Sequence, residues 1–151
     1  MDKSIFVGRL AGIKLQIHWS FSLVIAWVLF TTLLAGSTFA TALITLAFVL
    51  VIFGCVVLHE LGHALAARVF GIDTKDITVL PIGGVARLER IPRNPLQELV
   101  VALAGPAVNV VIAGVIFAFL WPLIGWQMFS GLPLAEGGFL SQLMLVNVAL
   151  V

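Results

Sequence analysis

The sequence predicts an all-α, polytopic membrane protein with about four transmembrane helices and a small cytoplasmic β-hairpin or re-entrant loop after the second helix. Of its 151 residues, 62% are hydrophobic and only 10% are charged, and the mean hydropathy is +1.20. A soluble domain is about 45–50% apolar and about 25% charged. A chain of this size is too apolar to shield its side chains from water, so we expect an integral, multi-pass membrane protein.

Four apolar segments are the expected spans, at residues 18–35, 40–70, 96–120 and 139–151. A helix needs about 20 residues to cross the hydrocarbon core, whereas the fourth segment has 13. We therefore expect residues 1–151 to form a single transmembrane domain that is truncated in its fourth span. The first segment has an alternative interpretation as a signal peptide, because Lys3, Arg9 and Lys14 precede it.

The region between the second and third segments is expected to contain a hairpin. Asp76–Leu80 has strand character, and Val85–Ile91 alternates apolar with polar residues over most of its length. Pro81–Gly84 separates the two as a turn. Asn94 is then a predicted helix cap, with Pro95 at the first position of the third helix.

The basic residues predict the orientation of the chain in the membrane. All eight Lys and Arg residues lie either before the first apolar segment or between Arg68, at the end of the second segment, and the start of the third. Because cytoplasmic loops carry the excess of basic residues, we expect the N-terminus and the 68–95 loop in the cytoplasm. The net charge of +1 and the lack of a basic cluster argue against a nucleic-acid partner.

The motif that bears chemistry is His59-Glu60-Leu61-Gly62-His63, at the end of the second apolar segment. On a helix, this spacing places two imidazoles on one face, where both can bind one zinc ion. Glu60 is then placed to act as general base on a metal-bound water. An alternative interpretation of the motif is that its three polar side chains form hydrogen bonds between helices. Ser, Thr and Asn make such bonds at lower cost in a membrane, which argues against this alternative.

A catalytic zinc site needs three protein ligands and a water, and the sequence provides two convincing ones. The other candidates are His18, Asp73 and Asp76. We interpret His18 as an interface residue beside Trp19, and the two aspartates as solvated loop charges. The single cysteine, Cys55, excludes an internal disulfide and a zinc site built from cysteines.

In these motifs the chain resembles the site-2 protease family of intramembrane zinc metalloproteases, with this chain as an N-terminal portion. The resemblance rests on the His59–His63 motif, on Pro81–Gly84, and on Ala104-Gly105-Pro106-Ala107-Val108-Asn109 in the third segment. It implies cleavage of transmembrane segments of substrate proteins, with Zn²⁺ as cofactor and Glu60 as catalytic residue. The family's third ligand is an aspartate in a later Asp-Gly motif, which we expect beyond Val151.

The resemblance and the need for an extended substrate assign a substrate-binding role to Gly83, Gly84 and Asn109. A helix hides its amide bonds, so we expect the substrate to unwind and add as a strand beside the glycine-containing loop. Ordinary turn glycines remain an alternative for Gly83 and Gly84, and packing between helices remains one for Asn109.

The sequence is compatible with three functions. The leading prediction is an intramembrane zinc endopeptidase, whose partners are a transmembrane protein substrate and the lipid bilayer. The alternative is a non-catalytic or truncated membrane protein of the same fold that acts as a binding or regulatory partner. A metal transporter with a two-histidine site would need polar residues along several spans, and the outer halves of these segments are nearly bare of them.

Overall fold

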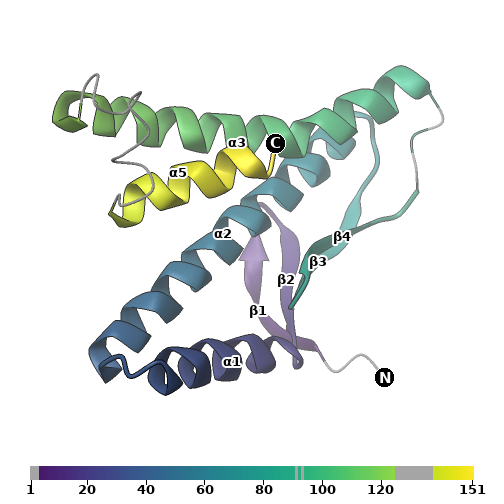
Figure 1. The fold of residues 1–151 in the computed structure, drawn as a ribbon. Helices are drawn as coiled ribbons and strands as arrows, with labels where there is room; N and C mark the ends of the chain where they lie inside the picture. Colours follow the sequence, from purple (N-terminus) through teal and green to yellow (C-terminus); the bar gives the residue numbers. More distant parts are fainter. Residues whose placement is uncertain (1–3, 91, 93, 125–137) are drawn as a thin grey trace.

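The computed structural model of the protein describes residues 4–90, 92, 94–124 and 138–151. The elements are β1 (Ser4–Leu10), β2 (Ile13–His18), α1 (Phe21–Leu34), α2 (Phe39–Val69), β3 (Thr74–Leu80), β4 (Gly83–Leu88), α3 (Pro95–Ile124) and α5 (Phe139–Ala149). Figure 1 shows α3 and α5 together on one side of α2, with the sheet on its other side. Lys3 and Arg93, two of the basic residues used to predict orientation, lie outside the described residues.

The predicted fold class is wrong. The described residues form four helices and a four-stranded mixed sheet, and among them only α2 and α3 are long and apolar enough to cross a membrane. The first and fourth apolar segments contain helices of only 14 and 11 residues, short of the roughly 20 that a span needs. The predicted hairpin exists as β3 and β4, but it is half of a larger sheet.

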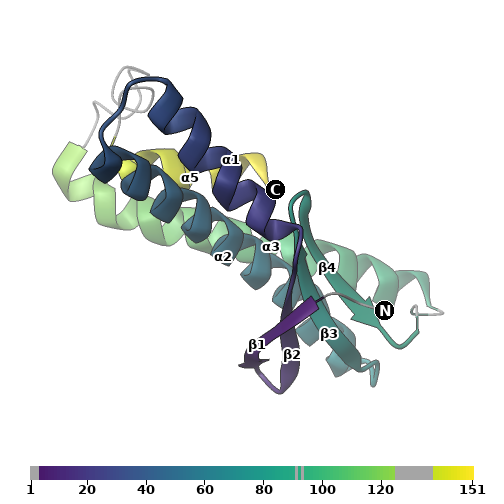
Figure 2. The ribbon, with the colours of Figure 1, turned by 90° about the horizontal axis from the view of Figure 1, so that it is seen from below.

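The sheet has the strand order β1-β2-β3-β4, so β1 and β4 are its edges. The outer pairs β1–β2 and β3–β4 are antiparallel hairpins, whereas β2 and β3 are parallel. A parallel pair needs a crossover connection, and α1 and α2 provide it here. Figure 2 shows that the strands gather toward one end of the helices.

The helix α2 packs one face on the sheet. Ala64 lies in a buried cluster with Ile13 of β2 and Ile77 of β3. One layer away, Val57 is buried with Val79 of β3 and with the start of α1. Because these contacts include the final turns of α2, the sheet holds the part of the helix that carries the His59–His63 motif.

The helices α2 and α3 cross closely at Gly62. A Cβ added there would lie 2.6 Å from the carbonyl oxygen of Ala104 and 2.8 Å from Val108 Cγ2. A side chain at this position would therefore push the two helices apart. The start of α3 is as predicted, because Asn94 Oδ1 accepts a hydrogen bond of 2.9 Å from the Leu96 N–H and the helix begins at Pro95.

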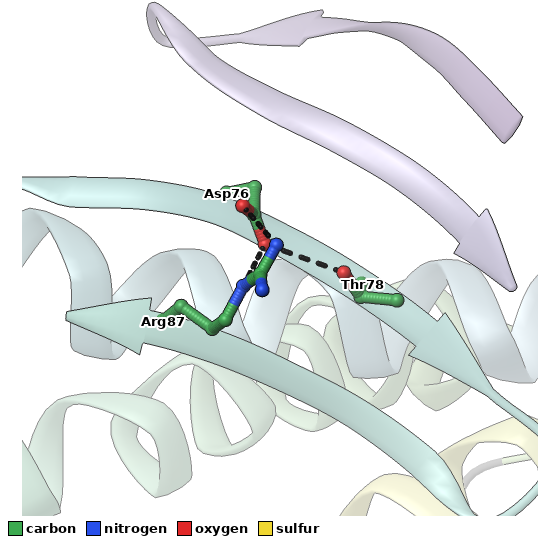
Figure 3. A network of polar contacts seen from close by, with 3 residues as sticks. All are labelled: Asp76, Thr78 and Arg87. Carbon is green, nitrogen blue, oxygen red and sulfur yellow. Dashed lines mark hydrogen bonds and ion pairs between the residues drawn. The ribbon is translucent and has the colours of Figure 1, made fainter. Parts of the chain in front are cut away.

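The hairpin of β3 and β4 is tied by an ion pair on the sheet face opposite α2 (Figure 3). Arg87 Nε and Nη2 donate to the two carboxylate oxygens of Asp76, over 2.8 and 2.7 Å. The hydrogen bonds from Arg87 hold the pKa of the Asp76 carboxyl below its ordinary value, so the carboxylate is charged at neutral pH. Asp76 is only 6% exposed, so its interpretation as a solvated loop charge is wrong.

Candidate metal centre

The two imidazoles of the motif converge on one point. His59 Nε2 and His63 Nε2 lie 3.1 Å apart, on successive turns of α2. Two nitrogens that each lie 2.0–2.1 Å from a tetrahedral zinc ion are separated by about 3.3 Å. The spacing therefore fits two ligands of one metal ion.

Gly105 of α3 leaves the space beside these nitrogens open. A Cβ added at Gly105 would lie 2.6 Å from His59 Nε2 and closer still to His63 Nε2. Any other residue here would fill the space in front of both nitrogens. Gly105 thus forms a cradle at the point where the imidazoles converge.

The other nitrogen of each imidazole is held by α3. His63 Nδ1 donates to the carbonyl oxygen of Val101 over 2.7 Å. This bond fixes the tautomer in which Nε2 has a free lone pair, which is the usual arrangement of histidines that bind a metal. His59 Nδ1 lies 2.9 Å from Asn109 Nδ2. Both rings are therefore oriented from their far sides by one helix.

The carboxylate between the histidines is held by the edge strand β4. Glu60 Oε2 accepts a hydrogen bond of 3.1 Å from the backbone N–H of Ala86. Gly84 lies against the same side chain, because a Cβ added there would come within 2.7 Å of Glu60 Cγ. The strand therefore orients the carboxylate, and the absence of a side chain at Gly84 gives Glu60 its room.

The described residues provide two histidine ligands and no cluster of three or more His, Cys, Asp or Glu side chains that could hold a metal. His18 Nδ1 pairs with Ser20 Oγ at 2.6 Å, and Asp76 pairs with Arg87. Neither interaction directs a side chain toward the two imidazoles. The donor set thus fits zinc as two of the three ligands of a catalytic site.

Most residues predicted from the sequence for this site do come together. Glu60, Gly84 and Asn109 all contact or adjoin the metal-binding motif. Gly83 stands apart, as the first residue of β4, at a φ of +140° that favours glycine, and a Cβ there would meet nothing within 4 Å. The positive φ accounts for a glycine at this position, and the substrate role of Gly83 stays a prediction.

Two groups that orient the site could not be found from the sequence. These are the carbonyl of Val101 and the N–H of Ala86, which are backbone groups that any residue would offer. Gly105 had a local signal, because it lies in the Ala104–Asn109 motif. The nearest neighbours of a Cβ at Gly105 are the imidazoles of His63 and His59.

Two converging imidazoles on one helix, with a glutamate between them, are the arrangement of the HExxH motif of zinc metallopeptidases. The chain belongs to peptidase family M50, the site-2 protease family, whose characteristic sequence matches residues 47–149. That stretch contains the histidine motif, the hairpin of β3 and β4, and α3.

Named relatives and a solved structure agree with this family. A zinc metalloprotease of Methanocaldococcus jannaschii is 37% identical over 112 residues, which cover 74% of this chain and 31% of the relative. A relative in Synechocystis sp., also named as a zinc metalloprotease, is 36% identical over 159 residues, which cover 99% of this chain and 39% of the relative. The solved structure of the site-2 protease from M. jannaschii matches with a TM-score of 0.66 and 28% identity, over 95% of this chain and 60% of that one.

These comparisons support a protease. The chain spans only 31–39% of the length of the two curated relatives.

The substitution Gly105→Ala should remove metal binding, because the new methyl group fills the space in front of both Nε2 atoms. The zinc content of the purified natural-length protein measures this directly. Gly114→Ala, in the same helix, is the matched control and should leave the zinc content unchanged, since a Cβ at Gly114 meets nothing within 4 Å. A Gly105→Ala protein with the zinc content of the wild type would contradict the cradle.

Proposed function

We propose that this chain is part of an intramembrane zinc endopeptidase that cleaves transmembrane segments of substrate proteins. The observation that supports this most is the convergence of His59 Nε2 and His63 Nε2, 3.1 Å apart, with Glu60 between them. The centre lies on α2, one of the two helices among the described residues that are long and apolar enough to span a membrane. A hydrolytic centre on such a helix favours substrates that are themselves in the membrane.

The positive-inside rule places this centre in the cytoplasmic half of the membrane. His59 precedes Arg68 by nine residues, or about 13 Å along a helix at 1.5 Å per residue. With Arg68 and the loop after α2 in the cytoplasm, the imidazoles lie below the lipid headgroups of the inner leaflet. The natural-length protein is accordingly multi-pass, with its N-terminus in the cytoplasm.

The side chains of the centre have separate roles in hydrolysis. His59 and His63 hold zinc through neutral imidazole nitrogens. Zinc bound there would supply a Lewis acid that polarises the scissile carbonyl and acidifies the attacking water. Glu60 takes a proton from that water on its carboxylate and then returns it to the leaving amine. The N–H of Ala86 keeps the carboxylate in place for both transfers.

The edge strand β4 is proposed to hold the substrate. A peptide bond inside a helix is shielded, so the substrate has to unwind before water can attack it. An extended peptide pairs with the free edge of a sheet through main-chain hydrogen bonds. β4 is such an edge, and it runs directly beside Glu60. Strand addition at β4 would therefore bring an extended segment next to the general base.

Glu60→Gln in the natural-length protein should reduce cleavage of a transmembrane substrate by at least about 10²-fold, because the amide accepts no proton. Zinc should stay bound, since both imidazoles are intact. Cleavage can be followed by gel electrophoresis in reconstituted vesicles, with zinc content measured in parallel. Full cleavage by the variant would remove Glu60 from the mechanism. A wild type that binds but never cleaves membrane substrates would support the non-catalytic alternative.

Disulfide cross-linking can test strand addition in the Glu60→Gln protein with Cys55 replaced by alanine. Val85→Cys on β4 should cross-link to single cysteines at every second position of the substrate, because a strand has a period of two. Val7→Cys on the opposite edge strand β1 is the control, since both valines are exposed. Cross-links with a period of three to four, or equal cross-linking from Val7→Cys, would contradict a strand paired with β4.

A further inference from the structure

Asn109 is fully buried beside the metal centre, and half of its side chain has no partner. Its Nδ2 contacts His59 Nδ1 at 2.9 Å and the carbonyl oxygen of Leu150 at 3.2 Å. Its Oδ1 is buried without a hydrogen bond. A buried amide oxygen without a partner is costly, so this acceptor calls for an explanation.

The protons of the metal-free centre can be placed by following one chain of hydrogen bonds. The Val101 carbonyl only accepts, so His63 carries its proton on Nδ1 and its Nε2 accepts. At 3.1 Å, the donor to this nitrogen is His59 Nε2–H. In the neutral ring, His59 Nδ1 is then an acceptor, and the Asn109 amide donates to it through Nδ2.

Metal binding changes which nitrogen of the His59 ring must carry the proton. A metal on Nε2 needs the lone pair of that nitrogen, so the proton of the neutral ring has to lie on Nδ1. An Nδ1–H needs an acceptor, and the Asn109 Nδ2 that now faces it is a donor. The oxygen and the nitrogen of the amide have nearly the same size, so a half-turn of the amide exchanges them without moving the rest of the side chain.

We propose that Asn109 is the positioning residue of His59, with an amide that donates to Nδ1 without metal and turns its Oδ1 to accept from Nδ1–H when metal is bound. This rests on the proposed metal centre. The half-turn gives Oδ1 a partner at His59 Nδ1–H, moves Nδ2 to the position that Oδ1 leaves, and takes the donor from the Leu150 carbonyl. His63 needs no such change, because its Nδ1 already donates to Val101. Asn109 therefore acts on the centre through His59 rather than by binding substrate.

Zinc affinity of the natural-length protein, measured by competition with a chromophoric chelator, separates this role from simple packing. Asn109→Leu keeps the bulk but has no acceptor, and it should weaken zinc binding by about 10–100-fold. Asn109→Asp keeps an acceptor at the same place and should retain wild-type affinity or exceed it. Asn147→Leu is the matched control and should have no effect. Asn147 is equally buried and its Oδ1 also has no partner, but its Nδ2 donates to Leu143 and Cys55 rather than to a histidine.

Nuclear magnetic resonance of ¹⁵N-labelled histidine gives a readout that packing alone would not change, and it needs only the wild type. Zinc should move the proton of His59 from Nε2 to Nδ1, whereas His63 should carry its proton on Nδ1 in both states. Unchanged affinity in Asn109→Leu, or a His59 proton that stays on Nε2 with zinc bound, would overturn this inference alone. A wild type that binds no zinc would overturn the proposed function with it.

Discussion

The close crossing of α2 and α3 is the constraint on which the centre depends. Gly62 allows the backbone of α3 to approach at Ala104, where a Cβ would come within 2.6 Å of the carbonyl oxygen. This approach brings Gly105 in front of both imidazoles and Val101 and Asn109 behind them. Buried helix contacts tolerate little change in volume. If the two helices crossed at a larger distance, the contacts of Gly105, Val101 and Asn109 with the imidazoles would all be lost together.

The sheet supplies the second constraint, from the opposite side of α2. The clusters around Ala64 and Val57 fix the end of α2 on β2 and β3. That packing places the edge strand β4 where its Ala86 N–H reaches Glu60. The imidazoles are thus oriented by α3 and the Glu60 carboxylate by β4. The three side chains of one short motif are therefore held by two independent elements.

The chemistry of the centre was predictable from the sequence because it is local. One turn of a helix separates His59 from His63, and the hairpin between α2 and α3 follows from alternation and its turn residues. The parallel pairing of β2 with β3 was missed, since the paired residues Lys14 and Asp76 lie far apart in the sequence. A local signal did exist in Ile13–His18, which alternates apolar with polar residues. Its Lys14 was considered only as one of the basic residues that precede the first predicted span.

X-ray absorption at the zinc edge of the natural-length protein tests the central claim most directly, namely that α2 presents two imidazoles to one metal ion. The account predicts one zinc per chain, with two imidazole nitrogens at about 2.0–2.1 Å in the first shell. It also predicts that His59→Ala and His63→Ala each remove one of these nitrogens or the metal altogether. A protein without zinc, or a zinc spectrum that neither substitution changes, would contradict the account.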